Sequence, residues 1–380
     1  MMREYSLASI RAAAALSCLL FALCSAQAQS VNGIGPAAGQ IVLIRPAEPK
    51  GGLKVVQAKG VDPVNATEKM LVRRGNLLNL DPKATAIVLC GDGAQRKLVP
   101  GLQPCPCTTP CTPEICGINY DGGKLRPTRG GADTDKSNYP VVISPRATLL
   151  LTTRPAIRWT PIAGPRESTT YKVTIYGENM KVIWSRNADS KTRLAYPDEE
   201  PALAEGQTYK VVVTAAGLSS ESERSPGLGF TTLTQDQALA LGGEETKRRQ
   251  LGLPDAQSRF LISTLYAARE LYSEAIDRLE DQYNANREAA VARALGDLYA
   301  AVGLNREAEK KYLEGLDITP KNDLDGQGLA QRALARVYGN LGMFDQAVKR
   351  LEAAIENYRR LKDRVTVNVL LDEERKLKKH

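Results

Sequence analysis

The sequence predicts a multidomain protein in which β structure precedes helical structure: a small β barrel-like domain, then a β sandwich, then a C-terminal α-solenoid. Three observations support this fold class. The chain has 380 residues, more than a single hydrophobic core normally organises. Up to residue 233, short apolar runs alternate with turns rich in Gly, Pro, Asp and Asn. From Thr234 onward the apolar residues follow the helical period, and the stretch repeats itself.

The first 28 residues have the organisation of a secretory signal peptide. Arg3 and Arg11 precede an uncharged run at 12–23, and the small-x-small pattern of Ala26 and Ala28 follows it. The run is shorter than the ~20 residues that a membrane-spanning helix needs. A buried N-terminal helix is the alternative interpretation. We expect export to an oxidising compartment, the bacterial periplasm or the extracellular space, and no transmembrane anchor.

The composition excludes several classes of function. The only histidine is His380, the last residue, so sites that need an internal imidazole are ruled out. The net charge of +8 is spread along the chain without a dense basic run interleaved with aromatics, which argues against nucleic-acid binding. Glycine-rich nucleotide loops and nucleophile motifs are lacking from the sequence as well. We expect a protein that is not an enzyme and holds no metal and no cofactor.

Five cysteines of the mature sequence lie within 27 residues: Cys90, Cys105, Cys107, Cys111 and Cys116. In an exported protein such crowding predicts disulfide bonds. A bridge between Cys105 and Cys107 would be strained. We therefore expect Cys90 to pair with Cys105 or Cys107, Cys111 to pair with Cys116, and one thiol to remain. A thiolate metal site is the alternative, but the short Cys pairs of structural zinc sites and a supporting histidine are lacking.

Residues 37–120 are expected to form the small, cysteine-containing β domain. Apolar runs at 40–44, 70–78 and 86–90 lie between turn-forming residues. The segment 73–93, RRGNLLNLDPKATAIVLCGDG, resembles the FecR-like periplasmic β domain, although Asn76 stands where that family usually has Asp. Residues 121–139 contain two Gly-Gly pairs and are expected to be a flexible linker.

Residues 140–233 are expected to form the β sandwich. Alternating apolar residues predict strands at 156–159, 170–176, 181–184 and 208–214. Trp159, together with the later segment from Leu203 to Tyr209, resembles the fibronectin type III pattern, which implies that Trp159 and Tyr209 are core residues. Because the segment has no cysteine, a disulfide-bearing immunoglobulin domain is excluded. Trp184 either packs in the same core or stacks on a carbohydrate.

The helical part contains an internal repeat. Three tyrosines and three alanines recur at spacings of 33 and 39 residues: Tyr266, Tyr299 and Tyr338, and Ala275, Ala308 and Ala347. The middle copy, from Leu295 to Pro320, resembles the tetratricopeptide repeat (TPR) nearly throughout. The resemblance covers about 255–360 and implies three stacked helix pairs. We expect a capping helix at 234–254 and a second capping helix or tail at 361–380.

The recurring small residues are expected to act in packing. Alanine at the three repeated positions lets the two helices of a pair approach closely. Gly303 and Gly342 are expected to end the first helix of a pair in a left-handed conformation. In the first copy, Glu270 stands in place of this glycine.

The TPR resemblance implies a groove lined by the first helix of each pair. It places eight side chains there: Gln257, Phe260, Thr264, Arg293, Asp297, Arg332, Arg336 and Asn340. The last three are spaced i, i+4, i+8 and so share one helical face, on which two guanidinium groups suit the carboxylate of a partner. Arg293 and Asp297 are expected to pair with each other. A solvated polar face without a ligand is the alternative.

These features favour a periplasmic protein-interaction scaffold that binds a protein or peptide partner through the helical groove, with the two β modules as spacers or second contact sites. A second hypothesis is an envelope sensor. Its N-terminal β domains would bind a ligand or a cell-envelope polymer, and the repeats would relay to a partner. A metal or redox function of the cysteine cluster is a third.

Overall fold

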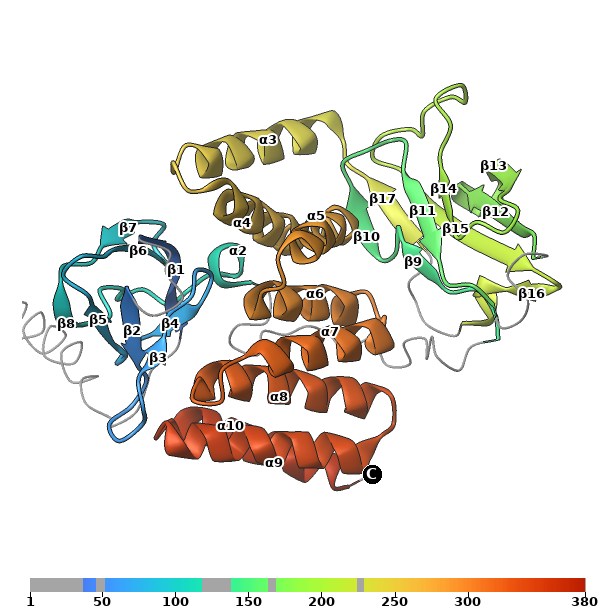
Figure 1. Ribbon diagram of the computed structural model, residues 1–380. Helices are drawn as coiled ribbons and strands as arrows, with labels where there is room; N and C mark the ends of the chain where they lie inside the picture. Colours follow the sequence, from blue (N-terminus) through green and yellow to red (C-terminus); the bar gives the residue numbers. More distant parts are fainter. Residues whose placement is uncertain (1–36, 46–51, 118–137, 163–168, 224–228, 380) are drawn as a thin grey trace, which may run out of the picture.

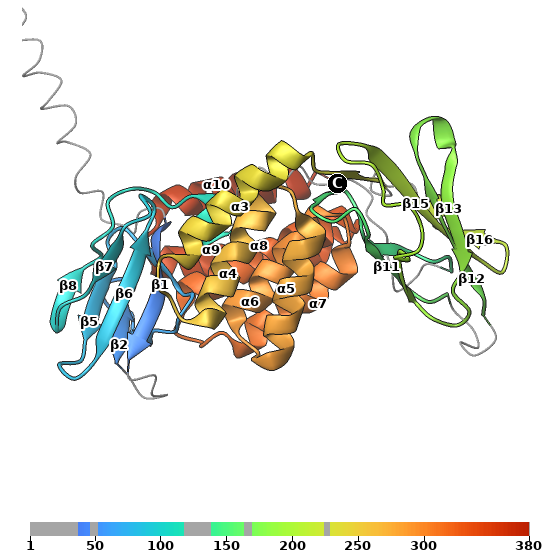
Figure 2. The ribbon, with the colours of Figure 1, turned by 90° about the horizontal axis from the view of Figure 1, so that it is seen from above.

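β sheets in the N-terminal part precede a run of helices in the C-terminal part. The computed structural model describes residues 37–45, 52–117, 138–162, 169–223 and 229–379. The predicted signal peptide, and the predicted linker except for its last two residues, lie outside these ranges. The helices occupy the centre of the molecule, and the two β regions lie on opposite sides of them (Figures 1 and 2).

The first β region consists of two four-stranded sheets, in the orders β4-β1-β6-β7 and β3-β2-β5-β8. Its elements are β1 (Ala37–Arg45), β2 (Leu53–Val56), β3 (Val64–Asn65), β4 (Leu71–Arg73), β5 (Leu77–Leu80), β6 (Thr85–Cys90), β7 (Gln95–Lys97), β8 (Gly101–Pro104) and the one-turn helix α2 (Pro113–Cys116). Ile41 and Val88 of the first sheet share one apolar cluster with Val55 and Leu78 of the second. The region therefore has a core of its own.

The predicted disulfide bonds are confirmed. Cys90 pairs with Cys107, and Cys111 pairs with Cys116. Of the two partners expected for Cys90, Cys105 is the one left as a half-buried thiol. Its backbone N–H donates to the carbonyl of Asn76, which continues the pairing of β8 with β5 beyond Pro104.

The second β region also contains two sheets, in the orders β10-β17-β15-β12-β13, with β16 on β15, and β14-β11-β9. Its strands are β9 (Val142–Ser144), β10 (Thr148–Leu150), β11 (Ala156–Trp159), β12 (Tyr171–Tyr176), β13 (Val182–Asn187), β14 (Arg193–Ala195), β15 (Thr208–Ala215), β16 (Leu218–Ser219) and β17 (Gly229–Thr232). The four strands expected from the alternation of apolar residues are present as β11, β12, β13 and β15.

Aromatic residues fill the core of the second β region. Trp159 packs against Tyr171 with ring centroids 5.6 Å apart, and Tyr209 is buried in the same cluster, as predicted. Trp184 is buried against Tyr196 at 5.2 Å, so the carbohydrate-stacking alternative for this ring is wrong. Trp184 is the one buried residue of β13, whose other residues are exposed.

The C-terminal part is a run of helices in which each contacts the next along the chain. Their bounds are α3 (Gln235–Arg249), α4 (Asp255–Ala268), α5 (Tyr272–Ala285), α6 (Ala289–Ala301), α7 (Asn305–Ile318), α8 (Leu324–Asn340), α9 (Phe344–Arg360) and α10 (Arg364–Leu377). Helix α3 begins with a capping box, in which the side chains of Thr234 and Gln237 satisfy each other's backbone N–H groups.

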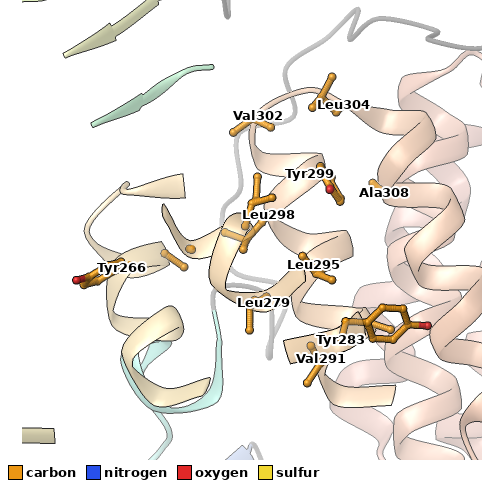
Figure 3. Packing of buried hydrophobic residues seen from close by; sticks show 14 of the residues in the cluster. Tyr266, Leu279, Tyr283, Val291, Leu295, Leu298, Tyr299, Val302, Leu304 and Ala308 are labelled. Carbon is orange, nitrogen blue, oxygen red and sulfur yellow. The ribbon is translucent and has the colours of Figure 1, made fainter. Parts of the chain in front are cut away.

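The turns after α4, α6 and α8 share one backbone feature. Gly303 and Gly342 have φ values of 79° and 73°, as predicted, and Glu270 adopts φ 60° at the corresponding place in the first copy. A non-glycine residue in this conformation costs about 1 kcal/mol. The recurring alanines and tyrosines are buried. Figure 3 shows three of them, Tyr266, Tyr299 and Ala308, among the apolar side chains of the helices.

Two glycines in helices allow a matched test of this packing. A Cβ on Gly296 of α6 would lie 2.5 Å from the Tyr312 ring of α7, whereas a Cβ on Gly242 of α3 would meet nothing within 4 Å. We expect Gly242→Ala to stabilise the protein by up to about 1 kcal/mol, since alanine favours helix. Gly296→Ala should destabilise it by about 1–3 kcal/mol because the ring must move. Denaturant unfolding measures both, and equal stability of the two variants would contradict this packing.

Candidate protein-interaction face

The predicted groove residues all lie on three helices. Gln257, Phe260 and Thr264 are on α4, Arg293 and Asp297 on α6, and Arg332, Arg336 and Asn340 on α8. We call these side chains, together with Leu261 of α4 and Leu329 of α8, the inner face. Figure 1 shows the first β region beside these helices, with α2 between its sheets and the helical stack.

The part of the inner face on α4 is covered by the first β region. Gln257 donates a hydrogen bond of 3.2 Å to the side-chain oxygen of Gln40, and the Thr264 hydroxyl donates one of 2.8 Å to the Glu114 carbonyl. The ammonium group of Lys69 lies 6.0 Å from the centre of the Phe260 ring. The predicted groove residues of this helix therefore contact a folded surface of their own chain.

Helix α2 makes part of the apolar contact. Ile115 packs against one cluster that contains Leu329 of α8 and against another in which Val42 and Leu89 of the β strands meet Leu261 of α4. The neighbouring Glu114 carboxylate accepts a 3.1 Å bond from Arg269 at the end of α4. A single helical turn thus lies beside apolar clusters that include side chains of both α4 and α8.

Charged contacts connect the same β region with α6, α8 and α10. The Lys69 ammonium lies 2.6 Å from Glu288, the N-cap residue of α6. The Arg73 guanidinium lies 2.8 Å from Asp325 in the first turn of α8 and 3.9 Å from Asp363, the N-cap residue of α10. These carboxylates also suit the positive ends of the helix dipoles.

Arg73, like Lys69, is almost fully enclosed. Its side chain is 3% exposed and stacks over the Tyr358 ring of α9 at 5.6 Å. Burial by itself would lower the pKa of the guanidinium, but Asp325 opposes this effect, and the net result is a pKa above the usual range. Arg73 is therefore held charged in the contact.

An amide completes the polar contact. The side-chain nitrogen of Gln57 donates a 2.6 Å bond to Asp323, the N-cap residue of α8. Burial raises the pKa of the Asp323 carboxyl, while the hydrogen bond from the N–H of Gly326 acts in the opposite direction. Asn76 holds this part of the β region in place by accepting from the N–H of Arg73 and donating to the carbonyl of Gln57.

The two arginines expected to bind a partner's carboxylate bind a carboxylate of the chain itself. Arg332 and Arg336 lie 2.7 and 3.1 Å from Glu373 of α10. Burial raises the pKa of Glu373, but hydrogen bonding and charge from the two arginines outweigh it and lower the pKa. The expectation that these guanidinium groups are open to a partner is therefore wrong in this structure, because α10 folds back beside α8.

The remaining predicted residues have partners within the helices. Asp297 accepts a 2.6 Å bond from the Tyr312 hydroxyl, and Asn340 donates one of 3.2 Å to Asn305. The half-buried Arg293 acts electrostatically on Asp323. These contacts join α6 to α7 and α8 to α7.

The second β region docks on α5 and on the C-terminal end of α6. The buried Arg146 guanidinium binds Glu223 within that region and donates a 2.6 Å bond to the Val302 carbonyl at the end of α6. Arg158 of β11 lies 2.7 Å from Glu280 of α5. Both β regions therefore pack against the helices.

Sequence reasoning missed the residues that make the contact with the inner face: Gln57, Lys69, Arg73, Glu114 and Ile115 from the β region, and Glu288, Asp323, Asp325 and Asp363 from the helices. The acidic residues carry a signal, since Asp and Glu before a helical period indicate a helix start. Nothing local marks isolated cations of a β region as their partners.

No protein family model matches the chain, and no curated protein matches it. Among the helices of the described ranges, none combines the length and the apolar character needed to cross a membrane. In the same part of the chain, no three or more His, Cys, Asp or Glu residues are grouped as ligands for a metal ion.

Adjacent arginines test the contact. Arg73→Glu would place a carboxylate against Asp325 and Asp363, and we expect a loss of about 3–5 kcal/mol in the free energy of unfolding. Arg74→Glu makes the same change at an exposed neighbour and should alter it by less than about 0.5 kcal/mol. Denaturant unfolding of the two variants decides the point. Equal stability would mean that the Arg73 contact contributes nothing.

The contact between the second β region and the helices should depend on pH through Glu274 of α5. Its carboxylate accepts a 2.7 Å bond from the N–H of Leu151, and burial raises its pKa to about 7. Between pH 4.5 and 7 the folded state binds more protons than the unfolded chain, so stability falls as pH rises through this window. In the wild-type protein the free energy of unfolding should fall by on the order of 2 kcal/mol over this window. Glu274→Gln should remove this fall, whereas Glu205→Gln on an exposed turn should leave it in place. Unfolding at pH 5 and pH 8 measures the difference, and an unchanged slope in Glu274→Gln would contradict it.

Proposed function

We propose that this protein is a non-enzymatic scaffold of the bacterial periplasm, and that its helices form a TPR-type solenoid whose inner face binds a partner protein. The shared left-handed turns at Glu270, Gly303 and Gly342 support the repeat assignment. The order of strands in the second β region, with Trp159 and Tyr209 buried, supports a fibronectin type III-like sandwich. The two sheets around one core support a barrel-like, FecR-like first domain.

The observation that carries the proposal is that the inner face already binds a folded protein surface. Its contact with the first β region combines carboxylates that receive cations with an apolar site for Ile115. These are the features of a protein–protein interface, which joins an apolar centre with charged pairs. A partner of similar chemistry would compete with the β region for this face. The β region has its own core and so could leave as a unit.

Export is supported by the two disulfide bonds, since such bonds persist in oxidising compartments. The periplasm is the proposed compartment on the strength of the signal-peptide pattern in the sequence. Both disulfides lie in the first β region, so this region is the one whose structure depends on the compartment.

Site-specific photo-cross-linking in envelope extract tests the proposal. A photoreactive residue at Leu329 of the inner face should capture a partner, and one at Leu313, exposed on α7, should not. Arg73→Glu should increase the yield of the Leu329 adduct several-fold because it weakens the competing contact, and Arg74→Glu should leave it unchanged. Adducts from Leu313 alone, or equal yields in the two arginine variants, would contradict partner binding at the inner face.

A second candidate function is the binding of a ligand or a cell-wall polymer by the first β region. The observation that favours it is an exposed apolar patch of Leu77, Val99 and Leu102 on β5, β8 and the turn before β8. Figure 1 shows these strands on the side of the β region that faces away from the helices. Retention of the mature chain on isolated cell walls, without any protein adduct from Leu329, would favour this function over the scaffold.

A further inference from the structure

We propose that the Cys111–Cys116 disulfide is a redox-sensitive latch that holds the first β region on the inner face, so that a dithiol reductant opens this face. That the opened face binds a partner rests on the proposed function. That the bridge holds the β region on this face does not. The latch is defined as residues 111–116, which comprise α2 and the two bridged cysteines.

The bridge lies in the contact between the β region and the helices. Both cysteines belong to an apolar cluster with Ala37 and Leu71 of the β region and Leu329 of α8. The backbone N–H of Cys111 donates a 2.9 Å bond to the carbonyl of Ala37. One end of the latch is thereby attached to β1, and the other end of the short loop returns to it through the bridge.

The latch presents three contacts from two consecutive residues. The Glu114 carbonyl accepts a hydrogen bond from Thr264 of α4, and the Glu114 carboxylate accepts one from Arg269 at the C-terminal end of the same helix. Ile115 packs against the apolar clusters that contain Leu261 of α4 and Leu329 of α8. A four-residue helix is not stable by itself in water. The bridge supplies the constraint that holds the turn ready for contact, and such preorganisation lowers the entropic cost of binding. Without the bridge, this cost falls on the docking step.

The other disulfide has a different place. Cys90 and Cys107 belong to the apolar cluster between the two sheets of the first β region, and no helix contributes to that cluster among the described residues. Its loss should weaken the β region itself. The two bridges therefore form a matched pair within one molecule, one in the core of the region and one in its docking contact.

The chemistry of opening is thiol–disulfide exchange. A thiolate of the reductant attacks one sulfur of the Cys111–Cys116 bond, forms a mixed disulfide and displaces the other cysteine as a thiolate, which takes up a proton. The second thiol of the reductant then closes its own disulfide and releases the first cysteine. The protein gains two hydrogens, and the reductant loses two.

Docking and reduction are thermodynamically linked. In the docked state Cys111 and Cys116 are only 3% and 5% exposed, so the reductant reaches the bond when the β region has left the inner face. Docking thus slows reduction of the bond. Because the intact bridge holds α2 ready for contact, the oxidised protein docks more tightly than the reduced one, and docking in turn disfavours reduction at equilibrium by the same free energy.

The first experiment measures protection. Mature wild-type protein and the Arg73→Glu and Arg74→Glu variants are treated with dithiothreitol, quenched by alkylation, and analysed cysteine by cysteine by mass spectrometry. We expect Cys111–Cys116 to be reduced about tenfold faster or more in Arg73→Glu than in the other two proteins. Cys90–Cys107 serves as the internal reference and should react at one slow rate in all three. Equal rates for Cys111–Cys116 would overturn the proposal.

The second experiment does not depend on Arg73. Hydrogen exchange of α4, residues 255–268, is compared in the mature Cys111→Ser/Cys116→Ser and Cys90→Ser/Cys107→Ser variants. The latch predicts faster exchange in α4 for the first variant with the β strands unchanged, and faster exchange in the strands for the second. Unchanged α4 exchange in the first variant would overturn the latch. If α4 opens but Leu329 captures no protein in that variant, the latch stands and the scaffold function fails.

Discussion

The buried guanidinium of Arg73 is the constraint on which the arrangement of the first β region and the helices depends. A cation out of contact with water is tolerated only with carboxylates and hydrogen bonds around it. Here they come from three elements, with Asp325 on α8, Asp363 at the start of α10 and the Tyr358 ring on α9. The same requirement operates on the other side of the stack, where Arg146 binds Glu223 and the Val302 carbonyl.

This constraint changes how the inner face must be understood. In this chain the inner face is a contact surface between the helices and the first β region. Any partner that uses the face has to offer cations to Glu288 and Asp325 and an apolar side chain near Leu329, because the β region already offers these groups. Partner binding and docking of the β region are therefore alternatives at one surface.

The cysteines show how local and long-range structure combine. The pairing of Cys111 with Cys116 follows from a short separation in the sequence. Its position against α8 follows only from docking. A bridge between two cysteines close in the sequence thus becomes part of an interface, and the redox state of this bond is coupled to the accessibility of the helical face against which it packs.

The sequence by itself determined the features that depend on short-range pattern. Alternation placed β11, β12 and β15, and the recurring alanines and glycines marked buried helix positions and left-handed turns, since side-chain direction and backbone conformation are local properties. Only the tertiary structure decided which charges meet. Arg73 and Asp325 are 252 residues apart, and Arg332 finds Glu373 41 residues away instead of a partner. Such pairs leave no periodic pattern in the sequence. The sequence contains many charged residues, and only the packing of the folded chain decides which of them come into contact.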